Sequence, residues 1–126
     1  MKGRITILCE NSVGPITGAL GEHGFAALIE PSEGEPLMFD TGQGLTLLHN
    51  ARRMNKDLSL VKKVVISHGH YDHTGGLKPL LEEFGAKQVL GHPGIFREYI
   101  KALRLFGDRI GQLADAPAVK LVDLAA

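Results

Sequence analysis

A short apolar segment in the middle of this chain leads directly into a dense group of side chains that can bind metal. Residues 62–66 are rich in valine and isoleucine and predict a strand, and the letters SHGHYDHTGG follow it. In an extended segment, residues two positions apart point the same way, so His68 and His70 can direct both imidazoles at one point. Asp72 and His73 come as the chain turns toward a helix, where they can face a second ion. A metal cluster is therefore expected at the end of this strand.

Isolated histidines are usually surface or core residues, but three histidines and one aspartate within six residues favour a metal site. Imidazole nitrogen and carboxylate oxygen suit Zn²⁺ best, and Mn²⁺ or Fe²⁺ as alternatives, so these ligands predict one or two divalent ions without fixing the metal. A close pair of such ions lowers the pKa of a bridging water toward neutrality and polarises a carbonyl or phosphoryl oxygen. The cluster indicates hydrolytic chemistry.

Composition predicts one soluble domain over residues 1–126, with 44% hydrophobic and 22% charged residues. Lysine plus arginine equals aspartate plus glutamate at 14 each, so no general attraction to nucleic acid or to an anionic membrane is expected. The single cysteine, Cys9, lies in the apolar run RITILCE and predicts a buried reduced thiol. Together with the lack of a long apolar segment, this favours a cytoplasmic protein.

The hydrophobic pattern predicts an α/β (α+β) arrangement that opens with antiparallel strands and then alternates strands with helices. A hairpin turn is expected at residues 31–36, around Gly34, and Gly85 is expected to end a helix in a left-handed conformation. In the first helix, Leu45, Leu48 and Ala51 fall at helical spacing. Strands are expected at residues 4–10, 25–29, 37–40, 62–66, 88–90 and 119–122, and helices within residues 41–57, 77–84 and 95–106.

The letters HGHYDH match the His-x-His-x-Asp-His signature of the metallo-β-lactamase-fold hydrolases. Residues 38–44, MFDTGQG, match the Phe-Asp-Thr-Gly element of that family. The segments ENSVGPITGALGEHGFAALIE, LLHNA and GHPGIF resemble one branch of it, whose members are described as similar to dihydropterin-ribofuranosylaminobenzene phosphate synthases. This resemblance extends from the first strand to about Arg97 and implies one sheet-plus-helices half of the αββα sandwich.

The resemblance also implies roles for individual residues. It makes His68, His70, Asp72 and His73 the metal ligands and gives catalytic roles to Asp72 and Asp40, with Asp40 orienting the ligands. For Asp40 taken by itself, the start of a turn before Thr41 is the alternative. Glu22 and His23 lie in a loop that resembles a segment near the mouth of the site, where they would contact substrate. A polar surface turn is the alternative for both residues.

The chain departs from the family after His73. In longer relatives, the later half supplies a third histidine to the first metal, a bridging aspartate and a further histidine to the second metal. Here the residues beyond His73 contain one histidine, His92, and three aspartates, none in the expected setting. The chain is therefore expected to lack the C-terminal half and to leave each metal with two protein ligands.

Two functions are consistent with these observations. The first is a metal-dependent hydrolase that uses a metal-bound hydroxide on an ester-like or phosphorylated small molecule. The alternative is a non-catalytic half-domain that acts as a metal-binding or assembly module. In either case, the sheet face that the second half would cover predicts a homodimer or a complementing C-terminal half. Neither nucleic acid nor membrane is an expected partner.

Overall fold

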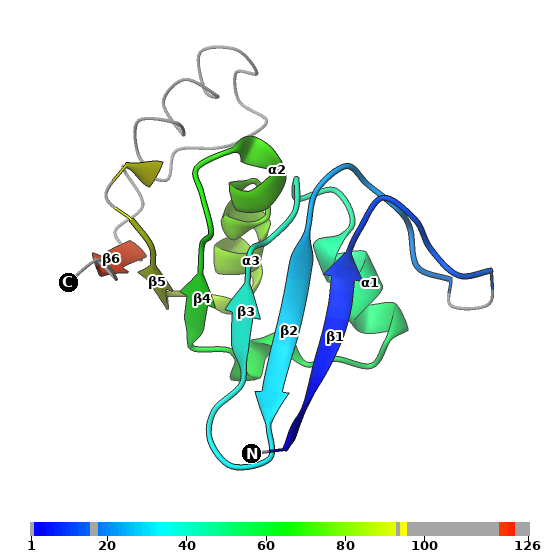
Figure 1. The fold of residues 1–126 in the computed structure, drawn as a ribbon, viewed down its shortest axis with the longest axis horizontal. Helices are drawn as coiled ribbons and strands as arrows, with labels where there is room; N and C mark the ends of the chain where they lie inside the picture. The colour runs from blue at the N-terminus through cyan, green and yellow to red at the C-terminus, as the bar shows by residue number, and fades with distance from the viewer. Residues whose placement is uncertain (1, 16–17, 93, 96–118, 123–126) are drawn as a thin grey trace.

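The architecture is a mixed six-stranded sheet with its helices packed on one face (Figure 1). It is taken from a computed structural model, which describes residues 2–15, 18–92, 94–95 and 119–122. The strands are β1 (Gly3–Cys9), β2 (Ala26–Pro31), β3 (Leu37–Phe39), β4 (Lys63–Val65), β5 (Lys87–Leu90) and β6 (Val119–Val122). The helices are α1 (Leu47–Arg53), α2 (Tyr71–Thr74) and α3 (Leu77–Phe84), and a 3-10 turn, η1, spans Leu58–Leu60.

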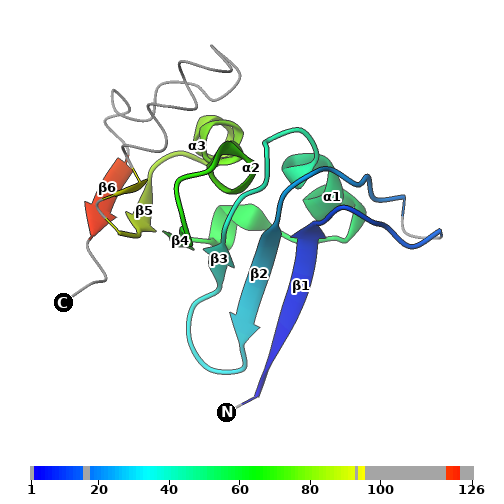
Figure 2. The same ribbon diagram turned by 45° about the horizontal axis from the view of Figure 1, so that its top comes forward.

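The strands lie in the sheet in the order in which they occur in the chain. β1, β2 and β3 pair antiparallel, and β3, β4, β5 and β6 pair parallel. The tight turn at residues 31–36 reverses the chain, whereas parallel neighbours require crossovers, which α1 with η1 and then α2 with α3 provide. Both views place these crossovers on the same face of the sheet (Figures 1 and 2). The predicted α/β half of the sandwich is confirmed.

The hydrophobic core lies between the sheet and the helices. Alternate residues of a strand point to the same face, and on the helix side neighbouring strands each contribute a fully buried apolar residue. These are Leu8, Leu28, Met38, Val64 and Val89, which pack with Leu47 and Ala51 of α1 and with Leu77 and Leu80 of α3. Each buried leucine or valine stabilises the fold by about 1.5–3 kcal/mol, so this layer fixes the strand ends that carry the polar residues described below.

The opposite face of the sheet, which we call the open face, carries a second apolar set. Its members are paired across the strands by register: Ile5 with Ile29 and Leu37, and Ile7 with Ala27, Phe39, Val65 and Leu90. Ile5 is 67% exposed and Ile7 41% exposed. In the part of the chain that the structure describes, no helix packs on this face (Figure 2).

The first helix starts later than predicted. Leu45 was expected within it but lies before α1 and is 63% exposed. The reason is the backbone between β3 and α1, where Asp40, Gly42 and Gly44 all have positive φ angles, which a right-handed helix does not accommodate. By contrast, α3 spans the predicted residues 77–84.

Two smaller expectations have clear outcomes. Gly85 ends α3 with φ +80° as predicted, but its ψ of −167° is extended and not left-handed helical. Cys9 is buried, as predicted, and burial raises the pKa of its thiol to about 12, although a contact with Thr46 Oγ1 opposes the shift. The helix expected at residues 95–106 lies outside the described residues beyond Ile95. No described helix is long and apolar enough to cross a membrane.

Candidate metal centre

Two neighbouring parallel strands end where the polar cluster begins. β3 and β4 are in register at Phe39 and Val65, so the residues that follow them, Asp40 and Ser67, meet at the same edge of the sheet. The Asp40 backbone N–H donates to the Val65 carbonyl at 2.8 Å. In return, the Ser67 backbone N–H donates to Asp40 Oδ1 at 2.7 Å. This reciprocal pairing fixes the carboxylate of Asp40 at the base of the cluster.

Asp40 is 1% exposed, and both oxygens of its carboxylate have hydrogen-bond partners. Its Oδ2 accepts from Ser67 Oγ at 2.6 Å and lies 2.7 Å from His73 Nδ1. An ionised carboxylate only accepts hydrogen bonds, so His73 Nδ1 carries the proton and its Nε2 presents a lone pair. Asp40 does stand at a turn, with φ +57°, but its buried carboxylate also sets the tautomer of a histidine. A role in the turn alone does not account for the burial and the hydrogen bonds of the Asp40 carboxylate.

Ser67 connects the carboxylate of Asp40 to a second histidine, His68, through hydrogen bonds. Its single hydroxyl proton is donated to Asp40, so its oxygen is left to accept from His68 Nδ1, which lies 2.8 Å away. His68 therefore also has its proton on Nδ1 and its lone pair on Nε2. One buried carboxylate thus prepares two imidazoles to bind a cation, directly for His73 and through Ser67 for His68.

The histidine rings converge at the strand end. The ring centroids of His68 and His70 are 4.7 Å apart, and those of His68 and His73 are 4.1 Å apart. Two sets have their ligand atoms within 4.8 Å of one another: Asp40 with His68 and His73, and His68 with His70 and Asp72. The structure thus brings together all four residues that the sequence placed in the cluster.

Asp72 and His73 lie on the short helix α2, and their ligand atoms face each other. His73 Nε2 is 3.4 Å from Asp72 Oδ2. Because Asp40 holds the proton on the other ring nitrogen, both atoms bring lone pairs to this contact. Two facing lone pairs repel each other unless a cation or a proton lies between them. The donor set therefore fits a divalent metal.

The electrostatics of His68 favour the metal-binding form of its ring. Burial lowers the pKa of His68, and the nearby His73 and His70 lower it further, while Asp40 and Asp72 oppose the shift. A lower pKa keeps the imidazole neutral, which is the state that donates a lone pair to a metal.

Hydrogen bonds and a close backbone approach at Gly76 hold the histidine motif against the loop after β3. The Thr41 backbone N–H and its Oγ1 both donate to the His73 carbonyl at 2.8 Å, and the Gly76 N–H donates to the Gly42 carbonyl at 3.1 Å. A Cβ on Gly76 would lie 1.9 Å from the Thr41 carbonyl oxygen. Glycine is needed here because backbone approaches backbone, and this approach sets the distance between Asp40 and His73.

Comparison with known proteins identifies the family. The model of the metallo-beta-lactamase superfamily matches residues 20–119, which is most of the chain. The chain belongs to the metallo-β-lactamase superfamily. Members of this superfamily bind divalent metals, and the residues described above are candidate ligands in this member.

Individual relatives refine the comparison. An uncharacterized protein, MJ0448, of Methanocaldococcus jannaschii is 38% identical over 88 residues, covering 68% of this chain and 34% of the relative. The 7,8-dihydropterin-6-methyl-4-(beta-D-ribofuranosyl)-aminobenzene-5'-phosphate synthase of the same organism is 31% identical over 99 residues, covering 75% of this chain and 34% of the synthase. The resemblance to this branch is confirmed, and the chain spans about a third of the length of these relatives.

A solved structure supports the fold. The metallo-beta-lactamase SMB-1, in a complex with mercaptoacetic acid, superposes with a TM-score of 0.54 at 24% sequence identity. The match covers 78% of this chain and 39% of SMB-1. At this identity the similarity shows the fold alone: this member of the superfamily has the fold of the matched part of SMB-1.

Glu22 has a structural role in this superfamily member. It is 8% exposed, and its Oε1 and Oε2 accept from the backbone N–H groups of Gln43 and Leu45, at 3.0 and 3.2 Å. Both carboxylate oxygens are therefore used to hold the loop between β3 and α1. These contacts show that Glu22 is not part of a freely solvated surface turn, and its predicted contact with substrate remains a prediction.

His23 lies beside the candidate ligands. Its Nε2 is 3.3 Å from Asp72 Oδ2, and its side chain is 65% exposed. The structure thus places it at the edge of the cluster, on the side of Asp72. Its predicted contact with substrate remains a prediction.

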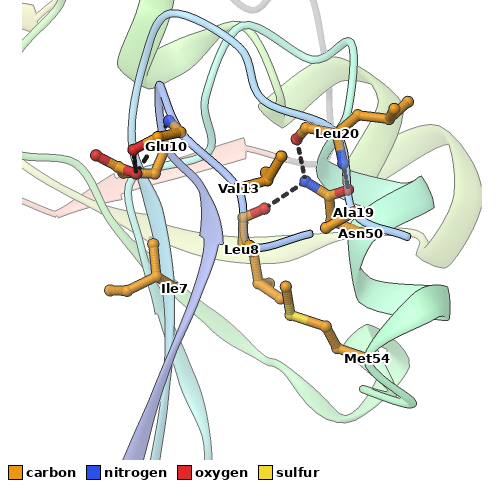
Figure 3. Close-up of a pocket in the computed structure, with 10 residues that line it drawn as sticks. Ile7, Leu8, Glu10, Val13, Ala19, Leu20, Asn50 and Met54 are labelled. Carbon is orange, nitrogen blue, oxygen red and sulfur yellow. Dashed lines mark hydrogen bonds between the residues drawn. The ribbon is translucent and has the colours of Figure 1, made fainter. Parts of the chain in front are cut away.

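The structural roles of two polar residues, Ser67 and Asn50, were not predicted from the sequence. Ser67 links Asp40 to His68, and only its position directly before His68 could have suggested it. Asn50 is 1% exposed and joins α1 to β1: its Nδ2 donates to the carbonyls of Leu8 at 2.7 Å and Leu20 at 2.9 Å (Figure 3). It borders a cavity of about 270 Å³ whose lining comes from β1, the loop after it and α1, and not from the histidine cluster.

Proposed function

We propose that this chain provides the metal centre of a hydrolase that acts on an ester-like or phosphorylated small molecule. The observation that carries the proposal is the convergence of ligand atoms at the strand end, where those of Asp40, His68 and His73, and those of His68, His70 and Asp72, lie within 4.8 Å of one another. Such an arrangement is built for a cation. We further propose that zinc is the metal, with manganese or iron as alternatives.

Each polar residue has a defined task in this proposal. His68 and His70 would hold one metal ion, and Asp72 and His73 would hold the other. Asp40 fixes the proton of His73 directly and that of His68 through Ser67. A divalent ion bound by these residues would supply a lowered pKa for bound water and polarisation of the substrate oxygen. No serine or cysteine nucleophile is required, which agrees with the buried, weakly acidic thiol of Cys9.

The proposed substrate class follows from charge and from the relatives. The formal net charge is zero, so this chain has no general attraction for a nucleic-acid backbone. The similar synthase carries a phosphate ester in its name, and this supports a phosphorylated small molecule as one candidate. Assays with candidate substrates would identify the substrate itself.

The test compares His68→Ala with His49→Ala. His49 is an exposed histidine of α1 whose Nε2 contacts the Gly18 carbonyl at 3.0 Å, so it controls for the loss of an imidazole elsewhere. We expect Zn²⁺-loaded protein to hydrolyse p-nitrophenyl esters or bis-p-nitrophenyl phosphate, and His68→Ala or chelation to reduce the rate at least about 100-fold. Hydrolysis that survives both treatments would contradict the proposal.

The open face favours a second candidate function, that of an assembly module. We propose that a second copy of this chain covers this face, because its paired apolar residues lie side by side across neighbouring strands and a two-fold dimer is the commonest way to bury such a surface. A complementing C-terminal half is the other occupant that the test would reveal.

Solution mass tests this assembly. We expect light scattering to give twice the chain mass of 13.6 kDa, and Ile5→Lys to return it to one chain by placing a charge among the apolar residues. Leu60→Lys is the matched control, because Leu60 is 61% exposed but lies on η1, outside the open-face set. A well-folded wild-type monomer would rule out the homodimer.

A further inference from the structure

We propose that His92 binds a phosphate group of the substrate by donating a hydrogen bond from its Nε2–H. This inference rests on the proposed function and deepens it, because it narrows the substrate class to phosphorylated molecules. It concerns a histidine that follows β5, outside the His-x-His-x-Asp-His motif, and that the proposed metal centre leaves without a task.

His92 lies at the edge of the sheet that carries the metal centre. β4 and β5 are parallel neighbours in register at Val65 and Leu90 (Figure 1). Their pairing continues one residue further, where the Ile66 N–H donates to the Leu90 carbonyl at 2.8 Å. Residues 67–68 and 91–92 therefore leave the sheet next to each other at the carboxyl ends of these strands. In open α/β sheets, ligands bind outside this edge.

The turn that carries His92 is anchored in the hydrophobic core. Ile95 belongs to this core, and its backbone N–H donates to the His92 carbonyl at 3.0 Å. A Cβ on Gly91 would collide with Ile95 Cδ1 and would lie 3.3 Å from the Ile66 carbonyl oxygen. The absence of a side chain at Gly91 thus leaves room for Ile95 against the end of β4. The backbone of His92 is held in place between these two contacts.

The ring of His92 carries its proton on the outer nitrogen. The Gly94 backbone N–H donates to His92 Nδ1 at 2.9 Å. Because an N–H can only donate, Nδ1 presents its lone pair, and the proton of the neutral ring lies on Nε2. This tautomer is the opposite of the one in His68 and His73, whose Nδ1 atoms carry the proton. His92 is exposed, so its Nε2–H is available to donate to a ligand.

A donor at this edge favours a substrate with negative charge. An N–H forms its strongest hydrogen bonds with ionised acceptors, of which phosphate oxygens are an example. A phosphate group presents several anionic oxygens, so it can accept from His92 while another part of the substrate occupies the proposed metal centre.

The competing role for His92 is to stabilise its own turn. That role uses only Nδ1, through the Gly94 N–H, and makes no use of Nε2–H. It predicts no difference in phosphate binding between wild type and a variant that lacks the ring. The two roles therefore differ in a quantity that can be measured without turnover.

Nitrogen-15 NMR of the histidine rings tests the donor directly in the full chain. We expect the proton of His92 on Nε2 in the metal-free protein, and a proton found on Nδ1 would overturn the inference. Inorganic phosphate added to the Zn²⁺-loaded protein should shift the Nε2 resonance of His92 and leave that of His49, the exposed histidine of α1, unchanged.

Phosphate affinity is then compared among variants of the Zn²⁺-loaded protein by calorimetry. His92→Ala removes the donor, His92→Gln supplies an amide N–H in place of Nε2–H, and His49→Ala is the control. We expect His92→Ala to weaken phosphate binding about 5-fold or more, and His92→Gln to retain most of the affinity. The KM for p-nitrophenyl acetate, a neutral ester, should not change in any of the three variants.

The outcomes separate this inference from the proposed function. If the wild type hydrolyses the ester and His92→Ala binds phosphate as tightly as the wild type, the inference is wrong while the proposed function stands. If His92→Ala raises the KM for the neutral ester as much as it weakens phosphate binding, His92 shapes the turn and does not select a phosphate. If the wild type neither binds Zn²⁺ nor hydrolyses any ester, the proposed function and this inference fail together.

Discussion

Replacing Asp40 by asparagine is expected to lower the affinity for divalent metal about 10- to 100-fold while leaving the fold intact. Asparagine tolerates the positive φ of this position, +57°, better than most residues, and its carbonyl oxygen can still accept from the Ser67 N–H. Its amide nitrogen, however, donates where Oδ2 accepted. His73 must then present a lone pair at Nδ1 and carry its proton on Nε2, the atom that faces Asp72.

The tautomer change is measurable independently of the metal. Nitrogen-15 NMR of the histidine rings should show the proton of His73 on Nδ1 in the wild type and on Nε2 in Asp40→Asn, and calorimetry should show the loss of affinity. Asp40→Ala provides the comparison. It leaves the Ser67 N–H without its partner, at a cost of about 1–3 kcal/mol in the free energy of unfolding. Wild-type metal affinity in Asp40→Asn would show that Asp40 does not control these ligands.

The second large effect is expected for Gly76→Ala, which should lower the free energy of unfolding by about 3 kcal/mol. The added Cβ would meet the Thr41 carbonyl oxygen at 1.9 Å, so α3 or the loop after β3 must move. Because Thr41 also donates to the His73 carbonyl, the same movement should separate Asp40 from His73 and weaken metal binding.

Gly85→Ala is the matched control for this substitution. Gly85 has φ +80° but no atom within 4 Å of an added Cβ, so it reports conformational strain without a clash, of about 1–2 kcal/mol. Urea unfolding of the metal-free proteins measures both values. A Gly76→Ala variant as stable as Gly85→Ala would mean that the close approach at Thr41 is unimportant.

Sequence reasoning succeeded where the information is local. The boundaries of α3 follow from its apolar spacing and from Gly85, and His68, His70, Asp72 and His73 are recognisable because they lie within six residues. Their division between two ions remains a prediction. In the folded chain, His68 lies within reach of both sets of ligand atoms.

The remaining features depend on contacts between distant parts of the chain. Ser67 acquires its role only because β3 and β4 are in register, which places it against Asp40, 27 residues earlier. The hydrogen bonds of Glu22 were not predicted because its partners, Gln43 and Leu45, become its neighbours only after the loop following β3 has folded back. Patterns within a short window do not contain such information.

The strand order has a consequence for how the site is assembled during synthesis. Every strand pairs with the one released just before it, so the sheet can grow at one edge as the chain leaves the ribosome. The meander of β1, β2 and β3 is complete, with Asp40 at its end, before residues 68–73 are made. The emerging histidines then meet a carboxylate already in place, and the ligands can be oriented as they are synthesised.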